Sequence, residues 1–145
     1  MAVQSVQKNP HGPIWPLGMI TVSAPGTPVG IMSLVDPNSY NDPASPTSAF
    51  SLEYTVRAWE IIFTACKPGA HGVAFNVGNV YILMKPVGSG AGNRDDYGSM
   101  LPPLGPAQTL ILSSAALNFN VWSPYAFFVD ADNAGDGALV TLIIQ

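Results

Sequence analysis

The sequence predicts an all-β protein: an antiparallel β-sandwich or jelly roll of about eight to ten short strands, with an extended N-terminal arm. Three observations support this prediction. The chain has 145 residues, the size of one domain, and 48% of them are apolar, which is enough for a core. Its 14 Gly and 14 Pro divide it into short runs. Those runs are rich in β-branched and aromatic residues, and none carries a helical apolar repeat capped at both ends.

Residues 1–18 are expected to form the arm, and residues 19–145 the single β-sandwich domain. Three prolines space out the arm, and its core candidates are Ile14, Trp15 and Leu17. The arm lies either on a neighbouring surface or on its own domain, and both interpretations stay open. In the first case, these three apolar residues belong to an interface.

The expected strands alternate with turns rich in Pro, Gly, Asn and Asp. Gly78-Asn79 is expected to join two strands in a tight turn or a bulge, and residues 36–48 and 85–98 are expected to be long loops. Residues 130–137, rich in Asp, Asn and Gly, form the last turn. The expected strands are residues 19–24, 29–35, 50–56, 58–66, 73–77, 80–84, 109–112, 119–122, 126–130 and 138–144.

Residues 58–66 show the strand pattern in detail. Trp59, Ile61 and Phe63 fall on one face at a period of two, so we expect all three to point into the core. Trp122, in a later strand, is expected in the core as well. A helix over residues 52–64 competes with this interpretation, but the aromatic and β-branched content favours a strand.

Charge is sparse: 10% of the residues are charged, against the usual quarter. A free monomer usually carries more surface charge, so we expect copies of the protein or a partner to cover much of the surface. A neutral surface hydrated by hydroxyl and amide groups is the alternative. The net charge is −4 and no basic cluster occurs, so nucleic-acid binding is not expected. With no signal-peptide pattern and no apolar run long enough to span a bilayer, we expect a soluble protein without a membrane partner.

Residues for catalysis do not converge in any known pattern, so we expect no enzymatic activity. His11 and His71 are not spaced as zinc ligands, either with each other or with the lone Cys66. Glu53 and Glu60 are the best carboxylate pair, but their odd separation places them on opposite faces of a strand.

The best metal candidates are the closely spaced carboxylates Asp130, Asp132 and Asp136, which lie beside a Gly turn and are suited to bind calcium through oxygen. The EF-hand pattern fails, because Ala134 stands at its fifth position and Thr141 at its twelfth. A turn in which Asp and Asn bond to their own backbone is the favoured interpretation, and no cofactor is expected.

Aromatic residues in loops are candidate interface anchors, because large rigid rings contribute most of the energy at interfaces. Tyr40 and Tyr97 lie in the two long loops, and Trp15 lies in the arm. The same rings suit a sugar-binding platform, and the sequence leaves this alternative open.

Four short motifs occur in a fixed order. I-T-V-x-x-P-G-T-P-V occupies residues 20–29, and an Asn-x-Gly turn before a Val-Tyr strand occupies residues 76–81. An L-x-P stretch lies in residues 101–112, with Gly105-Pro106 in place of Pro-Gly. A Y-x-x-x-V-D-A strand and a Gly-Asp turn leading into a last strand end the series. In this order the chain resembles the small head-decoration or minor capsid proteins of tailed bacteriophages.

The resemblance implies a β-sandwich that binds the outside of an icosahedral shell, often as a trimer, and stiffens it. The expected partner is therefore the major capsid protein, the expected state is a homo-oligomer with a trimer favoured, and the expected location is the virion surface after synthesis in a host cytoplasm. A carbohydrate- or receptor-binding β-sandwich on a tail or fibre is the alternative, with Tyr40 and Tyr97 as stacking groups. A small β-sandwich enzyme is a further alternative.

Overall fold

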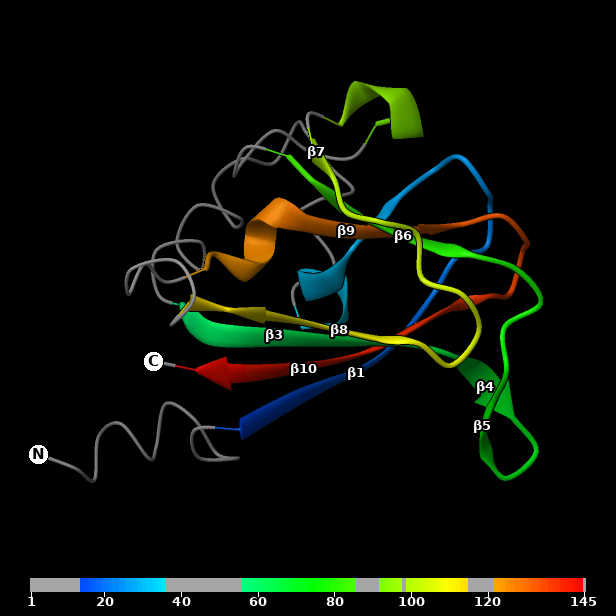
Figure 1. Cartoon of the computed structure of the whole chain (residues 1–145), viewed down its shortest axis with the longest axis horizontal. Coiled ribbons are helices and arrows are strands. Elements are labelled where there is room, and N and C mark those ends of the chain that lie inside the picture. Colours follow the sequence, from blue (N-terminus) through cyan, green and yellow to red (C-terminus); the bar gives the residue numbers. More distant parts are fainter. Residues whose placement is uncertain (1–13, 36–55, 86–91, 98, 115–121, 145) are drawn as a thin grey trace, which may run out of the picture.

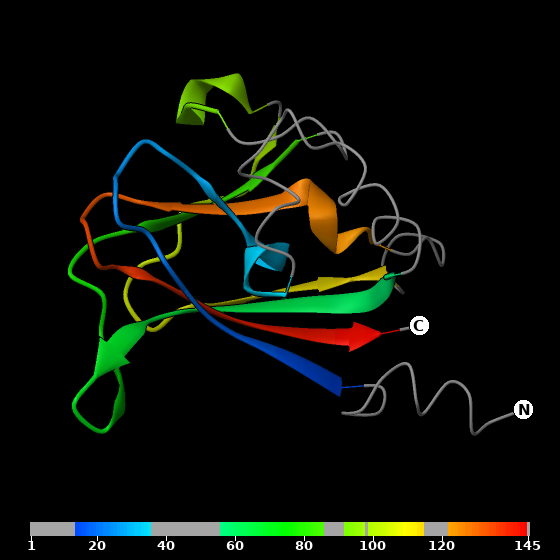
Figure 2. The same ribbon diagram turned by 180° about the vertical axis from the view of Figure 1, so that it is seen from behind.

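The computed structural model describes residues 14–35, 56–85, 92–97, 99–114 and 122–144. Two antiparallel four-stranded sheets pack on each other, and the described ranges contain no α-helix (Figures 1 and 2). The predicted antiparallel β-sandwich is confirmed. None of the short helices in these ranges has the length and apolarity needed to span a bilayer.

Sheet A has the strand order β1-β10-β3-β8, and sheet B has the order β2-β9-β6-β7. In sheet A these strands are β1 (Ile14–Thr21), β10 (Gly137–Ile144), β3 (Ala58–Ala65) and β8 (Thr109–Ser113). In sheet B they are β2 (Val29–Gly30), β9 (Phe127–Ala131), β6 (Val80–Met84) and β7 (Ser99–Met100). A separate hairpin, β4 (Lys67–Gly69) and β5 (Gly72–Ala74), projects beyond the end of β3 on the side away from sheet B (Figures 1 and 2). The described ranges include the 3-10 helices η1 (Ile31–Leu34), η2 (Arg94–Asp96) and η4 (Pro124–Ala126).

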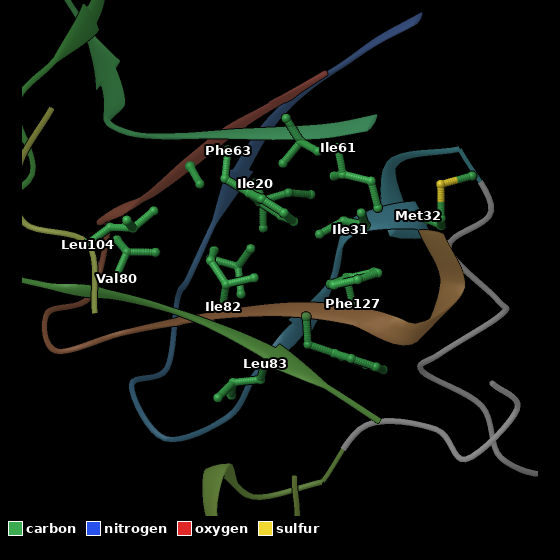
Figure 3. Close-up of a cluster of buried hydrophobic side chains, with 14 of the residues drawn as sticks. Ile20, Ile31, Met32, Ile61, Phe63, Val80, Ile82, Leu83, Leu104 and Phe127 are labelled. Atoms are coloured by element: carbon green, nitrogen blue, oxygen red, sulfur yellow. The ribbon is translucent and has the colours of Figure 1, made fainter. Parts of the chain in front are cut away.

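The core lies between the sheets, where alternate side chains of both are buried. Phe63 of β3 and Phe127 of β9 face each other with ring centroids 6.1 Å apart. Ile82 of β6 joins them from sheet B, while Leu83 points to the opposite side of the same strand (Figure 3). Trp122, expected in the core, is partly buried and packs edge-to-face on Phe127 at 5.8 Å.

Five predicted strands are confirmed to within one residue at each end, because each has an apolar face at a period of two or a fully apolar run. The predicted turn before β10 is also confirmed. The confirmed strands are those predicted over residues 58–66, 80–84, 109–112, 126–130 and 138–144.

Trp59 is a correction. It was expected to share the core face with Ile61 and Phe63, but it is 37% exposed, while both of the others are fully buried. The register between β10 and β3 shifts by one residue here, so that Ile143 pairs with Glu60 but Ile144 pairs with Ala58. This β-bulge leaves Trp59 without a partner in β10 and interrupts the alternation that would have placed it beside Ile61 and Phe63.

The tight turn predicted at Gly78-Asn79 is wrong, because β5 pairs with β4 and not with β6. The strand predicted over residues 29–35 is also wrong beyond its second residue. There the chain enters η1, whose adjacent Ile31 and Met32 are both buried.

The expected arm meets the sheet at residue 14. Residues 14–18 belong to β1, which pairs with β10 through a bulge between Pro16 and Gly18. Residues 1–13 lie outside the described ranges, as do residues 50–55 and 119–121 of two predicted strands.

Candidate functional site

Sheet B has an outer face that its own chain covers. Asp130 of β9 points outward and is fully buried, because Arg94 of η2 lies over it and donates to its carboxylate from Nε. Arg94 also donates from Nη2 to the carbonyl oxygen of Ala131 at 3.0 Å. The N–H of Gly26 donates to Asp130 at 3.0 Å, and the carbonyl oxygen of Gly26 accepts from the N–H of Arg94. This carboxylate therefore holds the turn after β1 and the loop after β6 against sheet B.

Electrostatics favour the charged form of Arg94. Burial lowers the pKa of its guanidinium, but the hydrogen bond and the negative charge of Asp130 outweigh burial and raise the pKa above its ordinary value. The guanidinium also lies 4.2 Å from the centroid of the Tyr81 ring, a cation–π contact. The Tyr81 hydroxyl donates to Asp132 at 2.9 Å, and this bond raises the pKa of the phenol above its ordinary value.

Asp136, fully buried at the start of β10, holds a second loop. Its carboxylate accepts the N–H of Val77 at 2.9 Å and the N–H of Gly78 at 2.8 Å. The Lys67 ammonium lies 3.7 Å away and supplies a positive charge. The peptide groups at Val77 and Gly78 thus bond to a side chain, which explains why the predicted hairpin turn does not form there.

Asn76 pairs with the backbone of Gly137 in the manner of a neighbouring strand. Its Nδ2 donates to the Gly137 carbonyl at 2.8 Å, and its Oδ1 accepts the Gly137 N–H at 3.1 Å. Gly137 has no room for a side chain, because a Cβ there would lie 1.9 Å from the carbonyl oxygen of Ile20. The sequence did not indicate the role of either residue. Asn76 lies four residues before a strand, and nothing in that position points to a partner 61 residues further along the chain.

The three candidate calcium ligands have these other partners. Asp130 bonds to Arg94, Asp132 to Tyr81, and Asp136 to backbone N–H groups near Lys67. Over the described ranges, no group of three or more His, Cys, Asp or Glu side chains is placed to hold a metal ion. The three carboxylates therefore bond mainly to groups far along the chain and not, as expected, to the backbone of their own turn; the N–H of Ala131, which donates to Asp130, is the local exception among the described residues. The role of Arg94 was missed, although a buried Asp in so sparsely charged a chain requires a cation.

Sheet A, in contrast, has an outer face that is apolar and exposed. In β10, Ala138, Val140 and Leu142 are fully buried, while Leu139 between them is 37% exposed. In β8, Ile111 is 56% exposed. We name the outward positions of this sheet the outer A face. Strand register and burial place in it Ile14, Pro16, Met19, Leu139, Thr141, Ile143, Glu60, Ile62, Thr64, Thr109, Ile111 and Ser113.

The outer A face has three cross-strand rows. Register aligns Pro16, Thr141, Ile62 and Ile111 in the middle row. Glu60, in an end row, is the one charged residue at these outward positions, and Ser113 donates to its carboxylate at 3.3 Å. An antiparallel sheet that faces water normally carries polar residues on that side, so this face departs from the rule.

Apolar side chains are also exposed where the chain leaves the β4–β5 hairpin. Val73, Phe75 and Val77 are 59%, 73% and 69% exposed. They occupy alternate positions from β5 into the segment that follows it. His71 lies in the turn of the hairpin and is exposed.

The predicted interface residues separate into four groups. Ile14 is 53% exposed and belongs to the outer A face, whereas Trp15 and Leu17 are partly buried against the core. Tyr97 is a correction: it is 6% exposed, because its ring packs edge-to-face on Phe128 with centroids 4.9 Å apart. Little of its ring is left for a protein partner or for stacking on a sugar. Tyr40 lies outside the described ranges, as do His11 and Glu53.

Fold and surface together define a small β-sandwich with one self-covered face and one exposed apolar face. No protein-family model, no curated protein and no solved structure matches this chain.

Proposed function

We propose that this protein is a structural subunit that acts through surface contacts and without catalysis, binding the outer surface of a phage capsid and stabilising or decorating the head. The observation that carries the proposal is the outer A face, a four-stranded surface whose large side chains other than Glu60 are apolar. Ile62, Ile111, Leu139 and Ile143 stand at positions where a solvated sheet carries polar residues. Such a face is typical of a surface that is buried in an assembly.

Burial of these side chains supplies the driving force for assembly. Each square ångström of apolar surface removed from water contributes about 25 cal/mol. A contact made by one copy is modest, but repetition over a lattice lets many modest contacts act together. A protein that stabilises a shell by surface contacts alone needs no chemistry beyond the burial of these side chains.

The order of the sequence motifs supports the choice of a phage head as the assembly. On this proposal the partner is the major capsid protein, and the subunits form homo-oligomers, with a trimer favoured by the resemblance. Synthesis takes place in the host cytoplasm and the protein ends on the capsid surface.

Rebinding tests the proposal. Purified capsids that lack this protein are mixed with it, and binding is measured by co-sedimentation while heat stability is followed by calorimetry. We expect saturable binding and a higher disruption temperature of the shell. Capsids that neither bind the protein nor change in heat stability would sink the proposal, and binding to a glycan array instead would favour the receptor-binding alternative.

A further inference from the structure

We propose that the outer A face packs against the outer A face of a second copy of this chain. The proposed function requires only that the outer A face be buried in the assembled particle. This inference rests on that requirement and identifies a second copy of the chain as the surface that buries the face. Contacts between two copies are measured without a capsid, so a failure of this inference can be distinguished from a failure of the proposed function.

The two outer faces of the sandwich differ in a way that points to a missing layer. On sheet B, Leu83 and Phe128 point outward, are buried, and lie beneath the segment that carries Arg94 and Tyr97. On sheet A, Ile111 and Leu139 also point outward but are 56% and 37% exposed. The described part of the chain therefore supplies a cover for one sheet and not for the other.

Charge favours a copy of the same chain as the cover. The protein has a net charge of −4, so two copies repel each other wherever their acidic groups meet. The outer A face has one acidic residue, Glu60, in an end row and bonded to Ser113. Packing two faces in opposite directions places the two Glu60 side chains at opposite ends of the contact. The two middle rows then bring together only Ile, Thr and Pro side chains.

Shape fits a second copy, and size sets how strongly two copies pair. Faces of two β-sheets pack well on each other at about 10 Å, with strands inclined by about 30°. Four strands about 4.8 Å apart, with five to eight residues each, give a face of roughly 300–500 Å². This is below the ~800 Å² per partner of a stable complex. We therefore expect weak, concentration-dependent pairing in solution that becomes strong where copies are held close together.

Pairing of one face with itself is isologous and gives twofold symmetry. The expected assembly therefore holds an even number of chains: two of 15.2 kDa each, or six where the threefold contact implied by the phage resemblance forms as well. Sedimentation equilibrium, at concentrations up to about 1 mM, measures this mass and the dissociation constant.

Charged substitutions locate the contact. Ile111→Lys places an ammonium group in the middle row, and we expect it to weaken pairing at least tenfold, by about 1.4 kcal/mol or more. Phe75→Lys is the matched control, because Phe75 is apolar and 73% exposed but lies on the hairpin segment outside the face. Circular dichroism checks that both variants are folded. An odd-numbered assembly, or pairing that Phe75→Lys weakens as much as Ile111→Lys, would overturn the proposal.

Cross-linking detects pairing even when the equilibrium lies toward the monomer. Cys66 is the single cysteine, so Cys66→Ala provides a background without thiols. In that background, Thr141→Cys lies in the middle row and Phe75→Cys lies outside the face. A short bismaleimide reagent spans the ~10 Å between packed sheets. We expect covalent dimers from Thr141→Cys and few from Phe75→Cys; equal yields indicate random collision and refute the inference.

Discussion

Replacing Asp136 with Ala removes the acceptor for two backbone donors at once. The N–H groups of Val77 and Gly78 bond to this carboxylate at 2.9 and 2.8 Å, and Lys67 lies 3.7 Å from it. A buried donor left unpaired costs about 1–3 kcal/mol. Water reaches this loop in part, because Val77 is 69% exposed, so we take the lower half of that range for each donor. The two donors together account for about 2–4 kcal/mol, and the lost ion pair, in which Lys67 is partly exposed, adds less than about 1 kcal/mol.

The expected change in melting temperature follows from the size of the chain. Unfolding entropy of about 2.1 cal/mol/K per residue gives about 0.3 kcal/mol/K for 145 residues. A loss of about 3 kcal/mol therefore lowers the melting temperature by about 10 °C. Asp136→Asn keeps one acceptor oxygen and is expected to lose about half as much.

Differential scanning calorimetry measures these changes, in the presence of either calcium or EDTA. Asp132→Ala is the control, because it removes a neighbouring but exposed carboxylate, and we expect a shift below about 3 °C. The loss in Asp136→Ala is expected to be the same with calcium and with EDTA. A loss smaller than about 2 °C refutes the reasoning. If calcium raises the melting temperature of the wild type and not of Asp136→Ala, then Asp136 is a metal ligand.

The other predictions concern the same end of the sandwich. Gly137→Ala places a methyl group against the carbonyl of β1 and is expected to cost at least about 3 kcal/mol in urea denaturation; a loss below 1 kcal/mol contradicts the packing argument. Arg94→Met leaves the buried Asp130 without its cation and is expected to cost about 2–3 kcal/mol of stability. This is less than the loss from a fully buried ion pair, because the Arg94 side chain is 27% exposed. A urea midpoint equal to that of the wild type contradicts this prediction. The pKa of Tyr81 is raised in the folded state, so the stability from its bond to Asp132 is present below pH ~10 and lost as the pH rises through the folded-state pKa. Urea denaturation of Tyr81→Phe is therefore expected to show a smaller alkaline loss than the wild type, and an equal loss assigns the effect to the lysines.

Strand positions were predictable from the sequence where alternation and turn residues agree, as in β3, β6 and β10. Burial of apolar side chains at a period of two is a local signal, and it needs no knowledge of the partner strand. The face of Trp59 was not predictable, because a bulge depends on how β3 aligns with a strand far along the chain. The predicted turn at Gly78-Asn79 failed for a related reason: its peptide groups bond to Asp136, 58 or more residues away.

For the candidate site, the sequence indicated a covered surface but not its place. Sparse charge is a property of the whole chain and has no location. One local signal was present: in residues 138–144, Leu139 and Ile143 are apolar although they alternate with buried residues. A middle strand of a sheet with one buried and one solvated face normally carries polar residues at its outward positions. Because Leu139 and Ile143 are apolar, the sequence of β10 predicts an exposed apolar face once the strand order is known.

The position of β10 also affects how the protein is made. β10 is the last strand in chain order, yet it lies between β1 and β3 in the interior of sheet A. On a ribosome, β1 and β3 are synthesised first and have no partner in common until residues 137–144 follow. During that interval their unpaired edges are open to other chains, and high contact order makes the final closure slow. Aggregation during expression is therefore expected to be more sensitive to changes in residues 137–144 than to changes of equal size in β7.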